Sequence, residues 1–127
     1  MRRSTALWIA LIPVLLQASC ALLTPARRPG SRGELVLSMP GAACVQVIGD
    51  WNDWGGLAAA GGVPDPSVGA MSSEDGSIWT CPLPSGLEIG WYRYAFLVDG
   101  WRWVADPLNP ETTMYTDREV SVLRVGN

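Results

Sequence analysis

Apolar and polar residues alternate with a period of two along most of the chain after residue 33. Six segments carry this pattern, with turn-forming residues between them: 34–39, 44–48, 77–83, 91–98, 101–105 and 119–125. No segment between them repeats apolar residues at the 3.6-residue spacing of a helix. Asp99-Gly100 joins the fourth and fifth segments, and Asp-Gly is a strong hairpin signal. The pattern predicts an all-β domain, an antiparallel β-sandwich of about six strands.

The alternation also predicts which side chains of the fourth segment face the core. Four residues share one parity, and we expect them to point inward: Tyr92, Tyr94, Phe96 and Val98. Arg93 has the other parity, so we expect that face to be wetter. The segment 55–76 is rich in Gly, Ala, Pro and Ser. We predict a surface loop there, with a short strand near 70–72.

The first 20 residues have the layout of a bacterial lipoprotein signal. Two arginines precede an apolar run that ends in "ASC", whose last residue is Cys20. We predict that Cys20 is lipidated and tethers the protein to a membrane, with a flexible linker over 21–33 and the domain over 34–127. An uncleaved anchor over 4–24 and ordinary cleavage with free secretion remain open. All three place the domain outside the cytoplasm.

Composition and charge exclude several classes of function. From residue 34 onward, four arginines stand against all 12 acidic residues of the chain, so we expect no nucleic-acid partner. The chain has no histidine, which excludes Ser-His-Asp and Cys-His catalysis. The carboxylate pairs Asp50 with Asp53 and Asp99 with Asp106 lie in turn motifs, where aspartate is common. We therefore predict no enzyme, no cofactor and no metal, although Asp50, Asp53 and Asp99 leave a calcium site conceivable.

Several motifs together resemble a known family. They are "VQVIGDWNDW", "LPSG", "YRYAFLVDG", the "W", "DP" and "NP" of 103–110, and a final "SVLRV". In this order they resemble the glycogen-binding domain, carbohydrate-binding module family 48. It occurs in the β-subunit of AMP-activated protein kinase and at the front of branching and debranching enzymes. The resemblance covers about 34–125. It implies an early-set immunoglobulin-like sandwich that binds α-glucan, such as glycogen or starch, without catalysis.

The resemblance also implies a binding site. Trp54 matches the family's exposed sugar-stacking tryptophan, whereas Trp51 matches a buried phenylalanine. A tryptophan at the edge of the core is the other interpretation of Trp54. Trp103 corresponds to the second sugar platform, with Trp101 as its neighbouring alternative. Asn52 shapes the turn and completes this end of the site. Flat aromatic rings suit the C–H faces of sugars.

Two positions depart from the family pattern. Ala95 stands where the family has a sugar-binding lysine, and Val120 stands near its binding asparagine. Arg93, of the same parity as Ala95, is a candidate substitute. The alternative function is an envelope protein-interaction domain that kept the fold and lost the sugar, and a more distant one is an accessory subunit for a separate envelope enzyme. Two coplanar exposed indoles at Trp54 and Trp103 favour sugar binding, and buried ones favour the alternative.

Two cysteines remain if Cys20 is lipidated, namely Cys44 and Cys81. An even number in an oxidising compartment makes a disulfide possible. The alternation argues against it, because Cys44 shares a face with Gln46 while Cys81 shares one with Leu83 and the core.

Lipidation of Cys20 predicts that Cys20→Ala releases the protein into the soluble fraction or leaves it unprocessed. Fractionation of membranes and measurement of the processed mass check this. If the variant is cleaved and retained in the membrane like the parent, the lipoprotein assignment is wrong.

Overall fold

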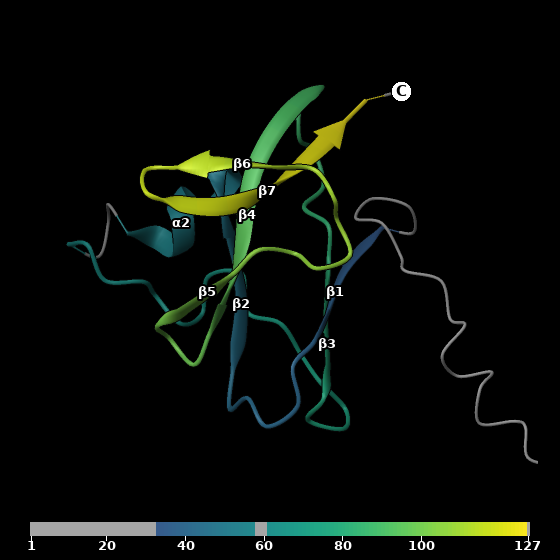
Figure 1. The fold of residues 1–127 in the computed structure, drawn as a ribbon. Coiled ribbons are helices and arrows are strands. Elements are labelled where there is room, and N and C mark those ends of the chain that lie inside the picture. Colours follow the sequence, from purple (N-terminus) through teal and green to yellow (C-terminus); the bar gives the residue numbers. More distant parts are fainter. Residues whose placement is uncertain (1–32, 58–60, 127) are drawn as a thin grey trace, which may run out of the picture.

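A computed structural model describes residues 33–57 and 61–126, and these residues form mainly antiparallel strands (Figure 1). The strands are β1 (Glu34–Ser38), β2 (Val45–Gly49), β3 (Ile78–Pro82), β4 (Gly90–Val98), β5 (Arg102–Val104), β6 (Thr112–Tyr115) and β7 (Arg118–Val125). A 3-10 turn, η1 (Asp50–Asn52), and a short helix, α2 (Asp53–Gly56), follow β2. All six predicted segments contain strands. The sequence pattern missed β6 and the two helical turns.

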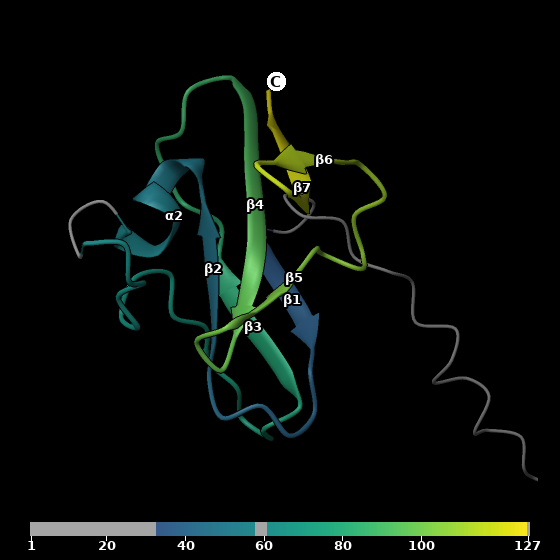
Figure 2. The same cartoon turned by 60° about the vertical axis from the view of Figure 1, so that its left-hand side comes forward.

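The strands form two sheets. β1 pairs with β3, and the larger sheet has the order β2-β4-β7-β6, with β5 also paired to β4. Every pairing between these strands is antiparallel. Figure 2 shows β1 and β3 behind the larger sheet. The prediction of an all-β domain with antiparallel sheets is confirmed.

The main core lies between the two sheets. Tyr94 and Phe96 are completely buried there and Val98 is nearly so, together with side chains from β1 and β3 such as Leu35 and Trp79. Tyr92 is partly buried against the same cluster. The inward-facing prediction for β4 is therefore confirmed, and it follows from the pleat of the strand.

The opposite side of the larger sheet, which we call the outer face, is less wet than the alternation predicts. Trp91 and Arg93 are exposed on β4, as expected. Ala95 and Leu97, of the same parity, are instead buried in a second apolar cluster with side chains from β2, α2 and β7. The prediction was wrong for this half of β4, because aromatic side chains from other segments cover it.

The loop after α2 is tied to both sheets. The buried Gln46 side-chain amide donates to the backbone carbonyls of Asp65 and Val68, at 2.9 and 2.8 Å. Gly69 has φ +69°, and a Cβ there would lie 2.0 Å from the carbonyl oxygen of Val47, so only glycine fits. The expected short strand is reduced to isolated bridges of Ala70 with β2 and of Ser72 with β3.

The signal segment, Cys20 and the linker up to residue 32 lie outside the described residues. In the described part of the chain, no helix is long and apolar enough to cross a membrane.

A buried polar network joins β4 to the connection between β5 and β6. The Tyr94 hydroxyl donates to Asp106 Oδ2 at 2.6 Å, and the Ser121 hydroxyl accepts the backbone N–H of Asp106 at 2.7 Å. Asn109 donates to the Tyr94 oxygen at 3.2 Å. Burial raises the pKa of Asp106, and the hydrogen bond from Tyr94 only partly offsets it. The network keeps a carboxyl group inside the fold.

Tyr94→Phe should lower the free energy of unfolding by about 1–3 kcal/mol, because it removes the hydroxyl that donates to the buried Oδ2 of Asp106. A raised pKa makes the contribution of Asp106 to stability fall as pH rises through that pKa. The hydrogen bond from Tyr94 stabilises the charged carboxylate more than the protonated carboxyl. The free energy lost in Tyr94→Phe should therefore be larger at neutral pH than in acid.

Urea unfolding at two pH values measures this effect. Tyr92→Phe is the matched control, because the Tyr92 hydroxyl makes an exposed bond to the carbonyl of Glu88 at 2.7 Å. It should cost about 0.5 kcal/mol or less. Equal losses in the two variants would contradict the importance of the buried bond.

Candidate functional site

The turn "GDWNDW" brings Trp54 back over the outer face. The Asn52 side chain holds the turn: its amide donates to the carbonyl of Val47 at 2.9 Å, and its oxygen accepts from the N–H groups of Gly49 and Gly55. Asp53 and Trp54 have φ of +55° and +53°, a left-handed conformation that non-glycine residues seldom adopt. The Asn52 side chain is thus engaged in hydrogen bonds with the backbone of the turn.

Trp54 is buried, with 5% of its surface exposed, so the expectation of an exposed platform was wrong. Its Nε1–H donates to Asp50 Oδ1 at 3.2 Å. The side chains beneath the indole explain why it is buried. Ala95 and Val120, at the positions where the resembling family has polar side chains, are completely buried in the same apolar cluster. Their small apolar side chains form a floor on which the indole packs.

Trp51 packs against the main core, as predicted, but remains half-buried. Its ring centroid lies 5.9 Å from that of Tyr94 and 6.4 Å from that of Tyr92. The two indoles of the turn therefore divide between the faces of the larger sheet. Trp51 covers the edge of the main core, and Trp54 belongs to the outer face.

Trp54, Trp103 and Tyr115 form a cluster of nearly parallel rings, here called the ring cluster. The centroids of Trp54 and Tyr115 are 3.9 Å apart at an interplanar angle of 17°, a face-to-face stack. Trp103 lies 5.7 Å from Trp54 and 6.3 Å from Tyr115. If the three rings were stacked in one column with Trp54 in the middle, the centroids of Trp103 and Tyr115 would lie much further apart than this. Trp103 therefore lies beside the stacked pair, and Tyr115 covers one face of Trp54.

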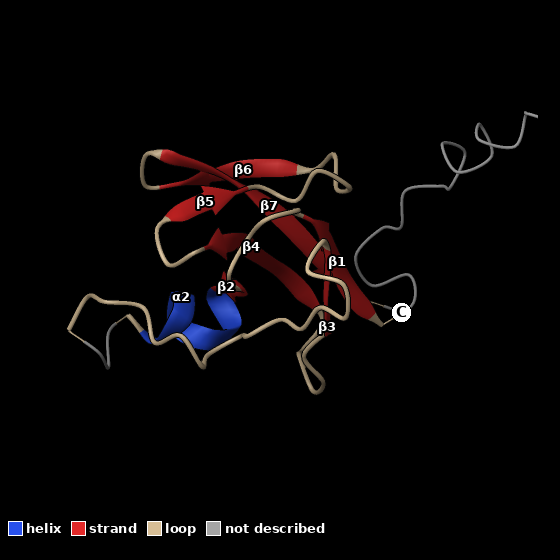
Figure 3. Cartoon of the chain, turned by 90° about the horizontal axis from the view of Figure 1, so that it is seen from below, coloured by secondary structure: helices blue, strands red, loops and turns tan. Residues whose placement is uncertain are grey.

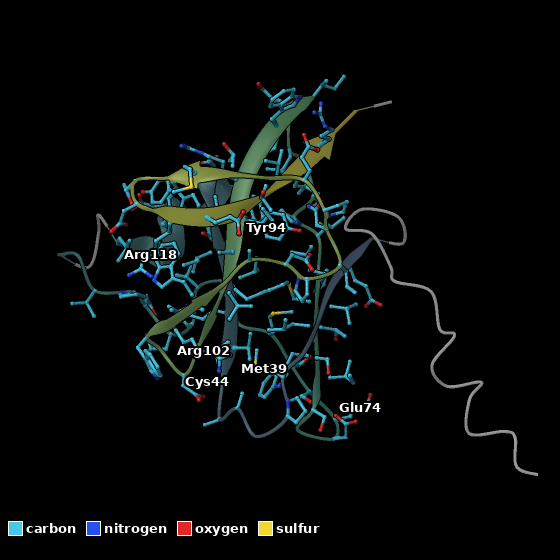
Figure 4. The ribbon with its side chains drawn as sticks, viewed as in Figure 1. Met39, Cys44, Glu74, Tyr94, Arg102 and Arg118 are labelled. Carbon is cyan, nitrogen blue, oxygen red and sulfur yellow. The ribbon has the colours of Figure 1, made fainter. Side chains whose placement is uncertain are left out.

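Two arginines lie over these rings. The guanidinium carbon of Arg118 is 4.7 Å from the Trp103 ring centroid, and that of Arg93 is 5.1 Å from the Tyr115 centroid. Such cation–π contacts contribute about 0.5–1 kcal/mol at exposed sites. Figure 4 shows Arg118 and the other labelled side chains on the ribbon. The β6–β7 hairpin thus supplies both Tyr115 and Arg118.

Asp50 fixes Arg93 in this position. The carboxylate accepts the backbone N–H of Arg93 at 2.7 Å and its Nε and Nη2 at 3.1 and 3.0 Å. Burial acts to raise the pKa of Asp50, but the hydrogen bonds and charge of Arg93 outweigh it and lower the pKa below its usual value. The bond to Asp50 raises the pKa of Arg93. Both groups are therefore charged at neutral pH.

The structure brings together three of the predicted site residues, Trp54, Trp103 and Arg93. Trp101 is 73% exposed at the β4–β5 turn and lies outside the ring cluster. Sequence reasoning missed Tyr115, because β6 is too short and too exposed to show alternation. It also missed Arg118, the first residue of β7, which lies one position before the predicted segment 119–125. Figures 1 and 3 show α2, β5 and the β6–β7 turn at the same end of the molecule, which explains how distant segments meet.

The possible disulfide is not formed. In the described part of the chain, Cys44 and Cys81 are free thiols, the first exposed and the second buried in the main core. Burial, with a smaller effect of Glu34, raises the pKa of Cys81 to about 11, so this thiol stays protonated and unreactive at neutral pH.

No family model and no curated protein matches the chain. Within residues 33–57 and 61–126, no three His, Cys, Asp or Glu side chains are gathered to hold a metal ion. The candidate calcium ligands Asp50, Asp53 and Asp99 therefore do not form such a group.

The burial of Trp54 makes its removal costly. Trp54→Ala should lower the free energy of unfolding by about 3–5 kcal/mol, the range for large core side chains. Trp51→Ala should cost less, because that indole is only half-buried. Urea unfolding of both variants measures the difference, and a smaller loss for Trp54→Ala than for Trp51→Ala would contradict the packing described above.

Proposed function

We propose that this protein is a non-catalytic carbohydrate-binding module for α-glucan, with the immunoglobulin-like fold of the glycogen-binding family that its motifs resemble. One observation carries the proposal. Three nearly parallel rings from separate segments, α2, β5 and β6, gather on the outer face, where the second sheet does not cover them. Flat rings suit the C–H faces of sugars, and the neighbouring charged groups suit their hydroxyl edges.

The geometry assigns different roles to the rings. Trp54 is a support, since one of its faces is covered by Tyr115 and its indole N–H is bonded to Asp50. Trp103 is half-buried, and we assign it the main contact with the sugar. Arg118 lies over Trp103, so the sugar displaces an exposed cation–π contact of about 0.5–1 kcal/mol.

The affinity should therefore be low. The polar family positions are apolar here, at Ala95 and Val120, and one ring face is already occupied by the protein's own side chain. We expect a dissociation constant near the millimolar end, roughly −4 kcal/mol. Arg93 is the candidate for hydrogen bonds to sugar hydroxyls, because Asp50 uses only part of its donor capacity.

The sequence supports a location for this activity. With Cys20 lipidated, the module is held by its linker at a membrane surface outside the cytoplasm, where it meets extracellular or envelope glycan. A separate envelope enzyme acting on the same glycan is the partner that such an arrangement favours.

A second candidate function is an envelope protein-interaction domain. The burial of Trp54 favours it, because a sugar platform that is covered by Tyr115 is not available without rearrangement. In this case the ring cluster only stabilises the packing of the outer face, and the sugar site has been lost while the fold remains.

Titration with maltoheptaose in a calorimeter distinguishes the two functions. The parent should bind near the millimolar range, and Trp103→Ala should weaken binding at least about tenfold. Trp101→Ala is the matched control, the same residue type two positions away but outside the ring cluster, and should leave the affinity unchanged.

The opposite result is also informative. A folded parent that shows no binding at about 30 mM maltoheptaose would contradict the carbohydrate-binding proposal and favour the interaction domain. A loss with Trp101→Ala instead of Trp103→Ala would move the contact away from the ring cluster.

A further inference from the structure

A groove lies on the outer face beyond the ring cluster. Its volume is about 410 Å³. Its lining residues come from β4, β6, β7 and the turn after β2: Asp50, Trp91, Arg93, Thr112, Thr113 and Val122, with Glu111 at the β6 end. We call it the β4–β6 groove.

Trp91 forms an exposed aromatic wall of this groove. It is 66% exposed, and of the two apolar clusters formed by the described residues it belongs to neither. The guanidinium carbon of Arg124 lies 4.1 Å from its ring centroid. Arg124 is in turn held by Glu111, whose carboxylate accepts a hydrogen bond from Nε–H at 2.7 Å and another from Nη2–H. The indole is thus supported on one face while most of its surface meets solvent.

The charges of the groove are paired. Arg93 is bonded to Asp50, and Arg124 is bonded to Glu111. Two ion pairs leave no unpaired charge among these four side chains, so they do not select an anion or a cation. Their remaining lone pairs and N–H groups, with the Thr113 hydroxyl, suit a neutral ligand with many hydroxyl groups. An exposed indole beside such groups is typical of a sugar-contacting surface.

The groove is continuous with the ring cluster. Asp50 accepts the indole N–H of Trp54 and also lines the groove, and Arg93 lies near the Tyr115 ring and lines the groove as well. Trp91 and Leu97 have the same parity on β4, and Leu97 pairs with Trp103 on β5. Six residues of a strand span roughly 20 Å, which is longer than one sugar ring.

We propose that the β4–β6 groove is a second subsite, in which Trp91 binds a further part of the same linear glucan that contacts Trp103. This inference rests on the proposed function. It predicts that affinity rises with chain length, because only a longer oligosaccharide covers both Trp103 and Trp91 at once.

Calorimetric titrations with maltotriose and maltoheptaose test the second subsite. The parent should bind maltoheptaose about tenfold more tightly than maltotriose. Trp91→Ala should weaken maltoheptaose binding about threefold to tenfold and change maltotriose binding by about twofold or less. Ile89→Ala is the control, an apolar side chain two residues away and 71% exposed, and should change neither. Glu111→Gln, which weakens the hold on Arg124, should give a smaller loss of the same kind.

Two failures are distinguishable. If the parent binds neither oligosaccharide, the proposed function and the second subsite are both wrong. If the parent binds both, but Trp91→Ala keeps the full preference for maltoheptaose, the second subsite alone is overturned. Trp103→Ala should weaken both sugars, which separates the ring cluster from the groove.

Discussion

The outer face of this protein depends on the carboxylate of Asp50. It receives the indole N–H of Trp54 from the turn after β2, and the backbone N–H and guanidinium group of Arg93 from β4. An exposed ion pair alone contributes little to stability. Here the geometry is bidentate and includes a backbone donor, which is the stronger and more specific arrangement. The same carboxylate therefore holds the position of one ring and of the cation beside another.

The arrangement of the rings follows from what lies beneath them. Ala95 and Val120 provide a small apolar floor, so Trp54 packs down onto the sheet and Tyr115 stacks on it. Polar side chains at these two positions would need hydrogen-bond partners and would keep the indole further from the sheet. The apolar residues at these two positions therefore explain why Trp54 is buried. They shift the proposed sugar contact toward Trp103 and the exposed end of β4.

Both charged pairs on the outer face also have a positional role. Asp50 orients Arg93 toward Tyr115, and Glu111 orients Arg124 against Trp91. Each carboxylate thereby orders a long, flexible arginine before any ligand arrives, which lowers the entropy cost of binding. The two aromatic ends of the face are linked by Arg93, which is near both. This gives the surface the form expected for an extended, uncharged ligand.

Local pattern was sufficient to predict most of the fold. The alternation of β4 decided which side faces the core, and Asp99-Gly100 adopts the two positive φ values that its hairpin requires. β6 was missed because four mostly exposed residues carry too little apolar signal. The resemblance also placed Trp54, Trp103 and Arg93 in one candidate site, and the structure brings these three side chains together. Tertiary structure alone decided that Trp54 is buried, that Tyr115 stacks on it and that Arg118 lies over Trp103. The burial of Trp54 depends on residues that are far apart in the chain, such as Ile48, Ala95 and Val120. The alternation within one segment carries no information on which distant residues come into contact.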